Sequence, residues 1–261
     1  MELRAAALQV LRLPDPAAKA AAARVLADTP GAWIDPAAVL VHAGPLPGRP
    51  ARPALVAHTA LARRSPFTPA GRAALLHAVA HIEFNAVNLA LDAVWRYAGM
   101  PEAYYRDWLR VASEEALHFK LLISHLATLG HAYGDFDAHD GLWTMVEKTA
   151  PDITARMALV PRTLEARGLD ATPPMQAKLR HAGDLRAVDI LEIILRDEVG
   201  HVAICNHWFR WLCARDGHEP LGHYAMLAQR HGAPRLRPPF NVAARRAAGF
   251  TADEIEALGA P

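Results

Sequence analysis

The feature that most constrains the fold is a pair of long helical segments separated by only two residues. Residues 69–98 and residues 101–129 each begin at a proline and are each followed by a glycine. Proline is favoured at the first position of a helix and glycine just beyond its end. Each segment would be about 45 Å long at 1.5 Å per residue. Because only Gly99 and Met100 lie between them, the two segments predict an antiparallel helical hairpin.

Helix signals also dominate the rest of the chain, and strand signals are almost absent, so the sequence predicts an all-α protein. We expect a ferritin-like antiparallel four-helix bundle with additional N- and C-terminal helices and irregular segments. The predicted division is an N-terminal helical and Pro-rich segment, the bundle, and a C-terminal helical tail, at residues 1–68, 69–217 and 218–261. The other predicted helices are 1–30 with breaks at Pro14 and Pro16, 141–168 with breaks at Pro151 and Pro161, 174–182 and 184–215.

A pattern of glutamate and histidine occurs twice in these predicted helices. Each copy consists of a single glutamate in one segment and a Glu-x-x-His motif in a later segment. The glutamate and histidine of each motif share a helix face, because residues three apart are neighbours there. The first glutamate precedes the motif by 32 residues in one copy and by 33 in the other, and the two histidines are 83 residues apart. Two antiparallel helix pairs related by a pseudo-two-fold axis would show this spacing. The residues concerned are Glu83, Glu115 and His118, and Glu165, Glu198 and His201.

Apolar residues surround these carboxylates at helical spacing, so the carboxylates are expected to be buried. A buried carboxylate without a partner costs several kcal/mol or takes up a proton, and a cation removes that cost. Four carboxylates and two imidazoles are the ligand set of di-iron and di-manganese bundles. We therefore predict two iron ions, with manganese as the alternative metal. Glu165 is the least regular member, because Pro161 lies in its helix, and Glu147 or Glu192 could contribute instead.

Two histidines and a group of arginines lie outside this ligand set. His77 and His81 precede Glu83 but point away from its apolar stripe, so we expect them to support the ligands or to lie at the surface. Several arginines of the tail form a basic patch that could bind a phosphate or simply be solvated. These arginines are Arg230, Arg235, Arg237, Arg245 and Arg246.

The segments HAVAHIEFNAVNLALDA, SEEALHF and LRDEVGH contain five of the six candidate ligands, and they resemble the DUF455 family. That family is grouped with ferritin-like tRNA hydroxylases that modify isopentenyl-adenosine. The resemblance covers roughly residues 55–245. It implies a ferritin-like bundle and oxygen chemistry at two irons. By residue-to-residue match it also implies that Glu83, Glu115, His118, Glu198 and His201 are ligands.

Charge, cysteine content and hydropathy limit the other classes of protein to which this chain could belong. The formal net charge is +1, so a nucleic-acid surface would have to be a local patch. The two cysteines, Cys205 and Cys213, lie in one predicted helix, which excludes a disulfide framework and fits a reducing cytoplasm. We expect no signal peptide and no membrane span, because the N-terminus lacks an apolar core with a cleavage site and no run of eighteen apolar residues occurs.

Two functions fit these observations. The first is an O2-dependent oxygenase or hydroxylase acting on a modified tRNA base or a small organic substrate. It would need an external electron donor, because the sequence has no dinucleotide or flavin motif. The alternative is an iron-binding or peroxide-scavenging protein without an organic substrate. A homodimer is among the assemblies that the sequence allows.

Overall fold

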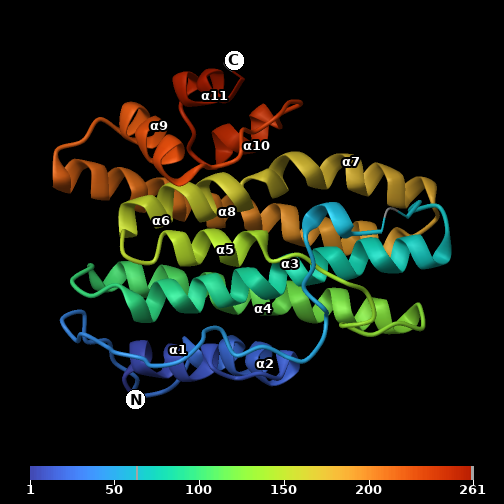
Figure 1. Ribbon diagram of the computed structural model, residues 1–261, viewed down its shortest axis with the longest axis horizontal. Coiled ribbons are helices and arrows are strands. Elements are labelled where there is room, and N and C mark those ends of the chain that lie inside the picture. The colour runs from blue at the N-terminus through green and yellow to red at the C-terminus, as the bar shows by residue number, and fades with distance from the viewer. Residues whose placement is uncertain (63, 260–261) are drawn as a thin grey trace. The chain divides into compact units, whose positions relative to one another are not determined.

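In a computed structural model, which describes residues 1–62 and 64–259, the chain is helical (Figure 1). No β-strand occurs among these residues, which contain two isolated β-bridges. The predicted all-α fold class is therefore confirmed. The chain divides into two compact units. Unit 1 comprises Met1–Gly141 and Asp184–Ile190, and unit 2 comprises Leu142–Gly183 and Leu191–Pro261.

Unit 1 contains two short helices, a single 3-10 turn, two long helices and the first turns of a third. These elements are α1 (Leu3–Leu11), α2 (Pro16–Leu26), η1 (His58–Ala60), α3 (Pro69–Arg96), α4 (Glu102–Thr128) and the start of α8 (Leu185–Asp216). Helix α1 packs against α3, and α2 packs against α4. The gap between α1 and α2 confirms the predicted helix break at Pro14 and Pro16.

Local capping signals set the ends of α3. The Thr68 hydroxyl accepts a hydrogen bond from the backbone N–H of Gly71 at 3.1 Å, which satisfies one of the free donors of the first turn. Gly99 has a φ of +79°, a left-handed conformation that glycine adopts without steric cost. The chain can therefore reverse direction within the short link to α4.

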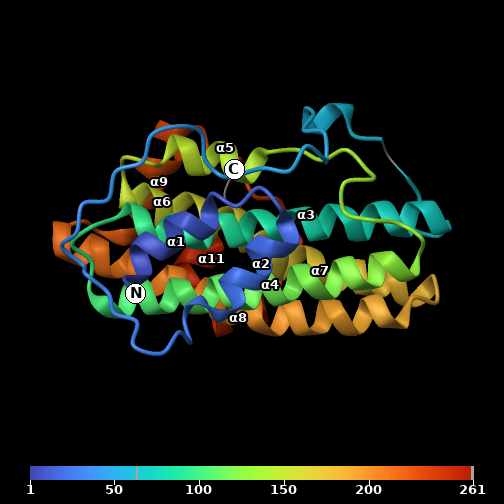
Figure 2. The same cartoon turned by 90° about the horizontal axis from the view of Figure 1, so that it is seen from below.

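Helices α3 and α4 form the predicted antiparallel hairpin and lie side by side in both views (Figures 1 and 2). Near the turn, the Tyr104 hydroxyl donates to the carbonyl of Ala93 at 3.3 Å. Farther from the turn, the ring centroids of Phe84 and Phe119 are 5.1 Å apart. The farther a pair of facing residues lies from the turn, the farther apart its two members are in the sequence, as in any antiparallel hairpin. This register fixes which side chains of α3 can reach α4.

Arg4 ties the N-terminal segment to the end of α3. Its side chain is fully buried and donates to the carbonyls of Val94 at 3.3 Å and Trp95 at 3.0 Å. These carbonyls lie in the last turn of α3, where no helical N–H is left to bond them. The guanidinium also donates to the carbonyls of Asp35 and Ala38, each at 2.7 Å. One cation therefore caps a long helix and fixes an irregular segment.

Lys19 makes a second buried contact with the hairpin. Its ammonium donates to the side-chain oxygen of Asn88 at 2.6 Å and to the carbonyl of Gly48 at 2.8 Å. It lies 5.0 Å from the centroid of the Phe84 ring. Burial, with a smaller effect of the Arg49 charge, lowers the pKa of Lys19 to about 7.

Helix α3 is long and apolar enough to cross a membrane by length and composition. Of its most apolar 18-residue window, 78% is buried inside the protein. A core helix of a soluble protein has the same length and composition, so these properties are weak evidence for a membrane span.

Unit 2 contains the remaining helices. They are most of α5 (Gly141–Lys148), α6 (Ile153–Leu159), the π-helix η2 (Val160–Glu165), α7 (Arg167–His181), the rest of α8, α9 (Pro220–His231), α10 (Val242–Ala247) and α11 (Ala252–Gly259). Helix α6 contacts α9, and η2 contacts α7. The short helices α10 and α11 contact each other.

The two prolines predicted to break the third long segment behave differently. The chain leaves the helix between α5 and α6, so the predicted break at Pro151 is confirmed. The predicted break at Pro161 is wrong, because the chain continues through it as the π-helix η2. Proline has no N–H to donate to the preceding turn, and a wider turn accommodates that loss.

Helix α7 is longer than the predicted segment 174–182, because it continues through Pro173 and Pro174. The missing N–H of Pro173 leaves the carbonyl of Leu169 without its helical donor. The side-chain amide of Asn241 donates to that carbonyl at 3.1 Å. A distant residue therefore compensates for what the proline removes, and sequence patterns along α7 do not reveal it.

The predicted basic patch of the tail is only partly correct. Arg230, Arg235, Arg237 and Arg246 are exposed. Arg245 is fully buried, and its guanidinium pairs with the carboxylate of Asp170 at 2.6 Å. It therefore stabilises the packing of α10 within unit 2 and does not contribute to a surface that binds phosphate.

Candidate metal centre

Unit 1 brings together Glu83 of α3 with Glu115 and His118 of α4. One ligand atom from each residue lies within 4.8 Å of the other two. The Nδ1 atom of His118 lies 3.2 Å from a carboxylate oxygen of Glu83 and 3.3 Å from one of Glu115. The exposed fractions of the three residues are 4%, 0% and 0% in chain order. Three potential metal ligands are thus buried at one point of the hairpin.

The hairpin explains why these residues meet. Glu115 and His118 are three residues apart on α4 and share one face. Glu83 reaches them because the antiparallel register places the middle of α3 against the middle of α4. The two carboxylates therefore approach one imidazole from different helices.

The charges at this point affect the protonation of His118. Burial alone would lower the pKa of His118, but hydrogen bonds and charges from Glu115 and Glu83 outweigh it and raise the pKa to about 12. A protonated imidazole then compensates the two carboxylates. A divalent cation would supply the same positive charge and accept the same donor atoms.

His77 and His81 lie on α3 near Glu83, and both are buried. The expectation that they could lie at the surface is therefore wrong. The backbone N–H of Gly134 donates to His77 at 2.9 Å. His81 lies 2.8 Å from the Tyr133 hydroxyl. Burial lowers the pKa of both histidines to about 4, so both are neutral near pH 7. Each imidazole is held by the loop that follows α4.

Tyr133 packs against two residues that adjoin candidate ligands in the chain, and it has no recognisable signal in the sequence. Its ring centroid is 5.1 Å from that of Phe119 and 5.7 Å from that of Phe84. Those two phenylalanines directly follow His118 and Glu83 in the chain. Tyr133 follows the glycine that ends α4, and only the path of that loop brings it back against the hairpin.

In unit 2, Glu198 and His201 lie one turn apart on α8. Ligand atoms of the two residues are within 4.8 Å of each other. Their exposed fractions are 6% and 1%. Glu165 is also buried, with 7% exposed, and it is the last residue of η2. Within the described part of the chain, its carboxylate is not among the groups of three or more ligand atoms that lie this close together.

The two alternatives to Glu165 differ from it in exposure. Glu147 and Glu192 are exposed. Glu147 accepts a hydrogen bond from the indole N–H of Trp143 at 3.1 Å. Glu192 accepts one from the side-chain amide of Gln176 at 2.9 Å. Burial therefore favours Glu165 over both alternatives as a ligand from this half of the sequence.

The chemistry of these residues fits a hard or borderline cation. Carboxylate and imidazole donors suit iron or manganese, whereas sites selective for softer metals are rich in thiolates. The two cysteines are buried, and Cys205 donates from its thiol to the backbone carbonyl of His201. Buried Glu and His groups in this chain could therefore hold a metal ion.

Comparisons with known proteins identify the family. The family model for DUF455, described as a protein of unknown function, matches residues 12–256. An uncharacterized protein of Haemophilus influenzae is 50% identical over 214 residues, which cover 79% of this chain and 74% of that protein. No solved structure matches the chain. Since the family model spans nearly the whole sequence, the chain belongs to the DUF455 family.

Proposed function

We propose that the chain is a non-haem di-iron carboxylate protein and acts as an O2-dependent oxygenase or hydroxylase. The observation that carries this proposal is the buried group of Glu83, Glu115 and His118. Converging buried carboxylates favour a nearby positive charge, and the raised pKa of His118 shows that its imidazole can supply one. A divalent cation held by the same three side chains would supply it as well.

The repeated sequence pattern extends the proposal to two metal ions. Glu165, Glu198 and His201 repeat the spacing of the first three residues, and all three are buried. Four carboxylates would neutralise the charge of two Fe(II) ions. Two irons held in this way would supply the redox chemistry that activates O2. The protein would hold them, and the surrounding apolar helices would exclude water.

The substrate and partners follow from the family resemblance. A modified tRNA base or a small organic molecule would be the substrate, and an external donor would supply electrons. Among the described residues, the exposed arginines of the tail are the candidates for contact with a polyanion. We place the protein in the cytoplasm, where the two free cysteines stay reduced.

The first test is the metal content of protein produced in iron-rich medium, with Mössbauer spectra before and after anaerobic reduction and exposure to O2. We expect about two irons per chain and spectra of a coupled pair. A matched pair of variants on α4 identifies the ligands. His118→Asn should lose iron, whereas His125→Asn should retain it, because His125 bonds Asp184 at 2.8 Å instead of the ligand group.

Absence of iron, or equal iron in both variants, would refute the di-iron proposal. Iron that reacts with hydrogen peroxide but leaves every tested tRNA and small substrate unchanged would refute the oxygenase proposal. That outcome would favour the peroxide-scavenging alternative.

A further inference from the structure

The π-helix η2 determines where Glu165 points. In this segment the N–H of Ala166 donates to the carbonyl of Pro161 at 3.1 Å, a bond that spans five residues. The Thr163 hydroxyl donates to the carbonyl of Ala158 at 2.7 Å. If the segment were an ordinary α-helix, Glu165 would be rotated by about 100° around the axis for the one residue removed. The π-turn is therefore part of the geometry of a candidate ligand.

Arg162 lies inside this π-turn and is only 4% exposed. Its Nε atom donates to the side-chain oxygen of Asn206 on α8 at 2.8 Å. Its Nη2 atom donates to a carboxylate oxygen of Glu254 at 2.6 Å. Three aromatic rings surround the guanidinium, with centroids 4.7 to 5.0 Å away, and they belong to Phe209, Tyr224 and Phe250. A cation so enclosed needs its anionic partner.

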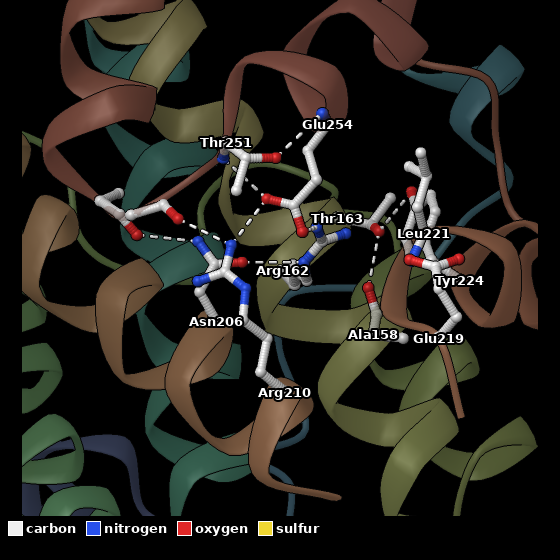
Figure 3. A network of polar contacts seen from close by, with 12 residues as sticks. Ala158, Arg162, Thr163, Asn206, Arg210, Glu219, Leu221, Tyr224, Thr251 and Glu254 are labelled. Atoms are coloured by element: carbon white, nitrogen blue, oxygen red, sulfur yellow. Dashed lines mark hydrogen bonds and ion pairs between the residues drawn. The ribbon is translucent and has the colours of Figure 1, made fainter. Parts of the chain in front are cut away.

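That partner comes from α11, near the C-terminal end of the chain. Figure 3 shows the Glu254 carboxylate between the guanidinium groups of Arg162 and Arg210. Its second oxygen accepts from Arg210 at 2.6 Å and from the backbone N–H of Thr251 at 2.8 Å. Asn206 donates in turn to the carbonyl of Ala248 at 2.8 Å. The tail is thus bonded to η2 and α8 through one buried polar network.

We propose that Arg162 and Glu254 are positioning residues for Glu165, with the C-terminal helix α11 holding the π-turn in the conformation that metal binding requires. The inference rests on the proposed function, because it takes Glu165 as a ligand. Its physical basis is that a π-turn has little stability of its own and persists where contacts from outside the helix hold it.

The chain offers a matched control for this network. Asp170 pairs with the fully buried Arg245 at 2.6 Å and also ties the C-terminal tail to unit 2. It lies on α7, beyond the π-turn. Glu254→Gln and Asp170→Asn therefore each remove one carboxylate charge from a contact with the tail, and only the first change touches Arg162.

Two measurements on the full-length variants test the inference. The first is amide hydrogen exchange of the segment 160–166 in metal-free protein, which needs no metal or activity. The second is anaerobic titration with Fe(II). In Glu254→Gln we expect about tenfold faster exchange of this segment. We also expect about tenfold weaker Fe(II) binding, as for other residues that orient metal ligands. Asp170→Asn should change both much less, because its partner Arg245 reaches this segment only through a 3.4 Å bond to the carbonyl of Ala166.

The outcomes separate this inference from the proposed function. If wild-type protein binds no Fe(II), the proposed function fails, and the exchange data alone decide whether the tail holds the π-turn. If wild type binds Fe(II) but both variants behave alike, the specific role of Arg162 and Glu254 is refuted. Should Glu254→Gln fail to fold, Arg210→Met is the second variant. It removes one partner of the same carboxylate and should give a smaller change in the same direction.

Discussion

The two units present their candidate ligands on different kinds of helix. In unit 1, Glu83, Glu115 and His118 lie on uninterrupted α-helices, and the imidazole bonds both carboxylates. In unit 2, Glu198 and His201 lie on the α-helix α8 in the same way. Glu165 instead ends a π-helix that is bonded to the C-terminal tail.

This difference separates two ways of orienting a side chain. A ligand on a regular hairpin is oriented by helix geometry and by the turn that sets the register, which are both local. A ligand after a π-turn is oriented by the contacts that hold that turn, and in unit 2 these include Glu254, which is 92 positions from its partner Arg162. We therefore expect the stability of unit 1 to depend on charge compensation among its candidate ligands. In unit 2 we expect the orientation of Glu165 to depend on contacts with the C-terminal tail.

The largest effect is expected in unit 1 for His118→Asn in metal-free protein. The change removes the imidazole that both buried carboxylates contact and should lower the free energy of unfolding by about 3 kcal/mol, measured by urea denaturation. The double variant with Glu83→Gln should recover part of this loss, because one charge is removed. A double variant less stable than His118→Asn would show that packing, rather than charge, explains the effect.

An intermediate effect is expected in unit 2 for Glu254→Gln, which should lower the free energy of unfolding by about 2 kcal/mol near neutral pH. Burial alone would raise the pKa of Glu254. The charges of Arg162 and Arg210 and the hydrogen bond from the Thr251 N–H outweigh burial and hold this pKa below its usual value. A carboxylate with a lowered pKa stabilises the fold above its unfolded pKa, and this stabilisation is lost as the pH falls through the folded pKa.

Denaturation at several pH values tests this sign. The difference between wild type and Glu254→Gln should be constant from pH 7 to about pH 5 and shrink below about pH 4.5. Backbone N–H groups lower the pKa of the nearby Glu219, so its carboxylate is charged between about pH 5 and pH 7 in both proteins. Its contribution to stability should therefore cancel when the two proteins are compared. A difference that grows on acidification would contradict the assigned pairing.

The smallest effect is expected for Thr163→Val, which removes the hydroxyl bonded to the Ala158 carbonyl and to the Tyr224 hydroxyl, at 2.7 and 2.9 Å. We expect a loss of about 1 kcal/mol, measured by thermal unfolding. Thr163→Ser keeps the hydroxyl and should retain most of the stability. Equal losses in the two variants would show that the methyl group, rather than the hydrogen bonds, stabilises the π-turn.

Several features of unit 1 could be predicted because their causes are close in sequence. Two prolines, two glycines and a two-residue link were enough to predict the hairpin, and helical spacing was enough to predict that Glu115 and His118 share a face. The prediction that Glu83 is buried beside them followed from the apolar stripe of α3. Arg4 and Tyr133 could not be predicted, because their contacts depend on the path of irregular segments.

The limits of the sequence are clearest at the prolines of unit 2. By itself, the sequence determined the all-α class and the long helices, since these depend on residues within a few turns of one another. The repeated spacing of glutamates and histidines is a property of the sequence itself. Only the tertiary structure decided that the chain passes through Pro161 as a π-turn and through Pro173 as an α-helix. The physical reason is that a proline removes one helical hydrogen bond, and whether the helix ends there depends on contacts from distant segments. Asn241 bonds the carbonyl of Leu169, which loses its donor at Pro173, and Glu254 bonds Arg162 in the turn that contains Pro161.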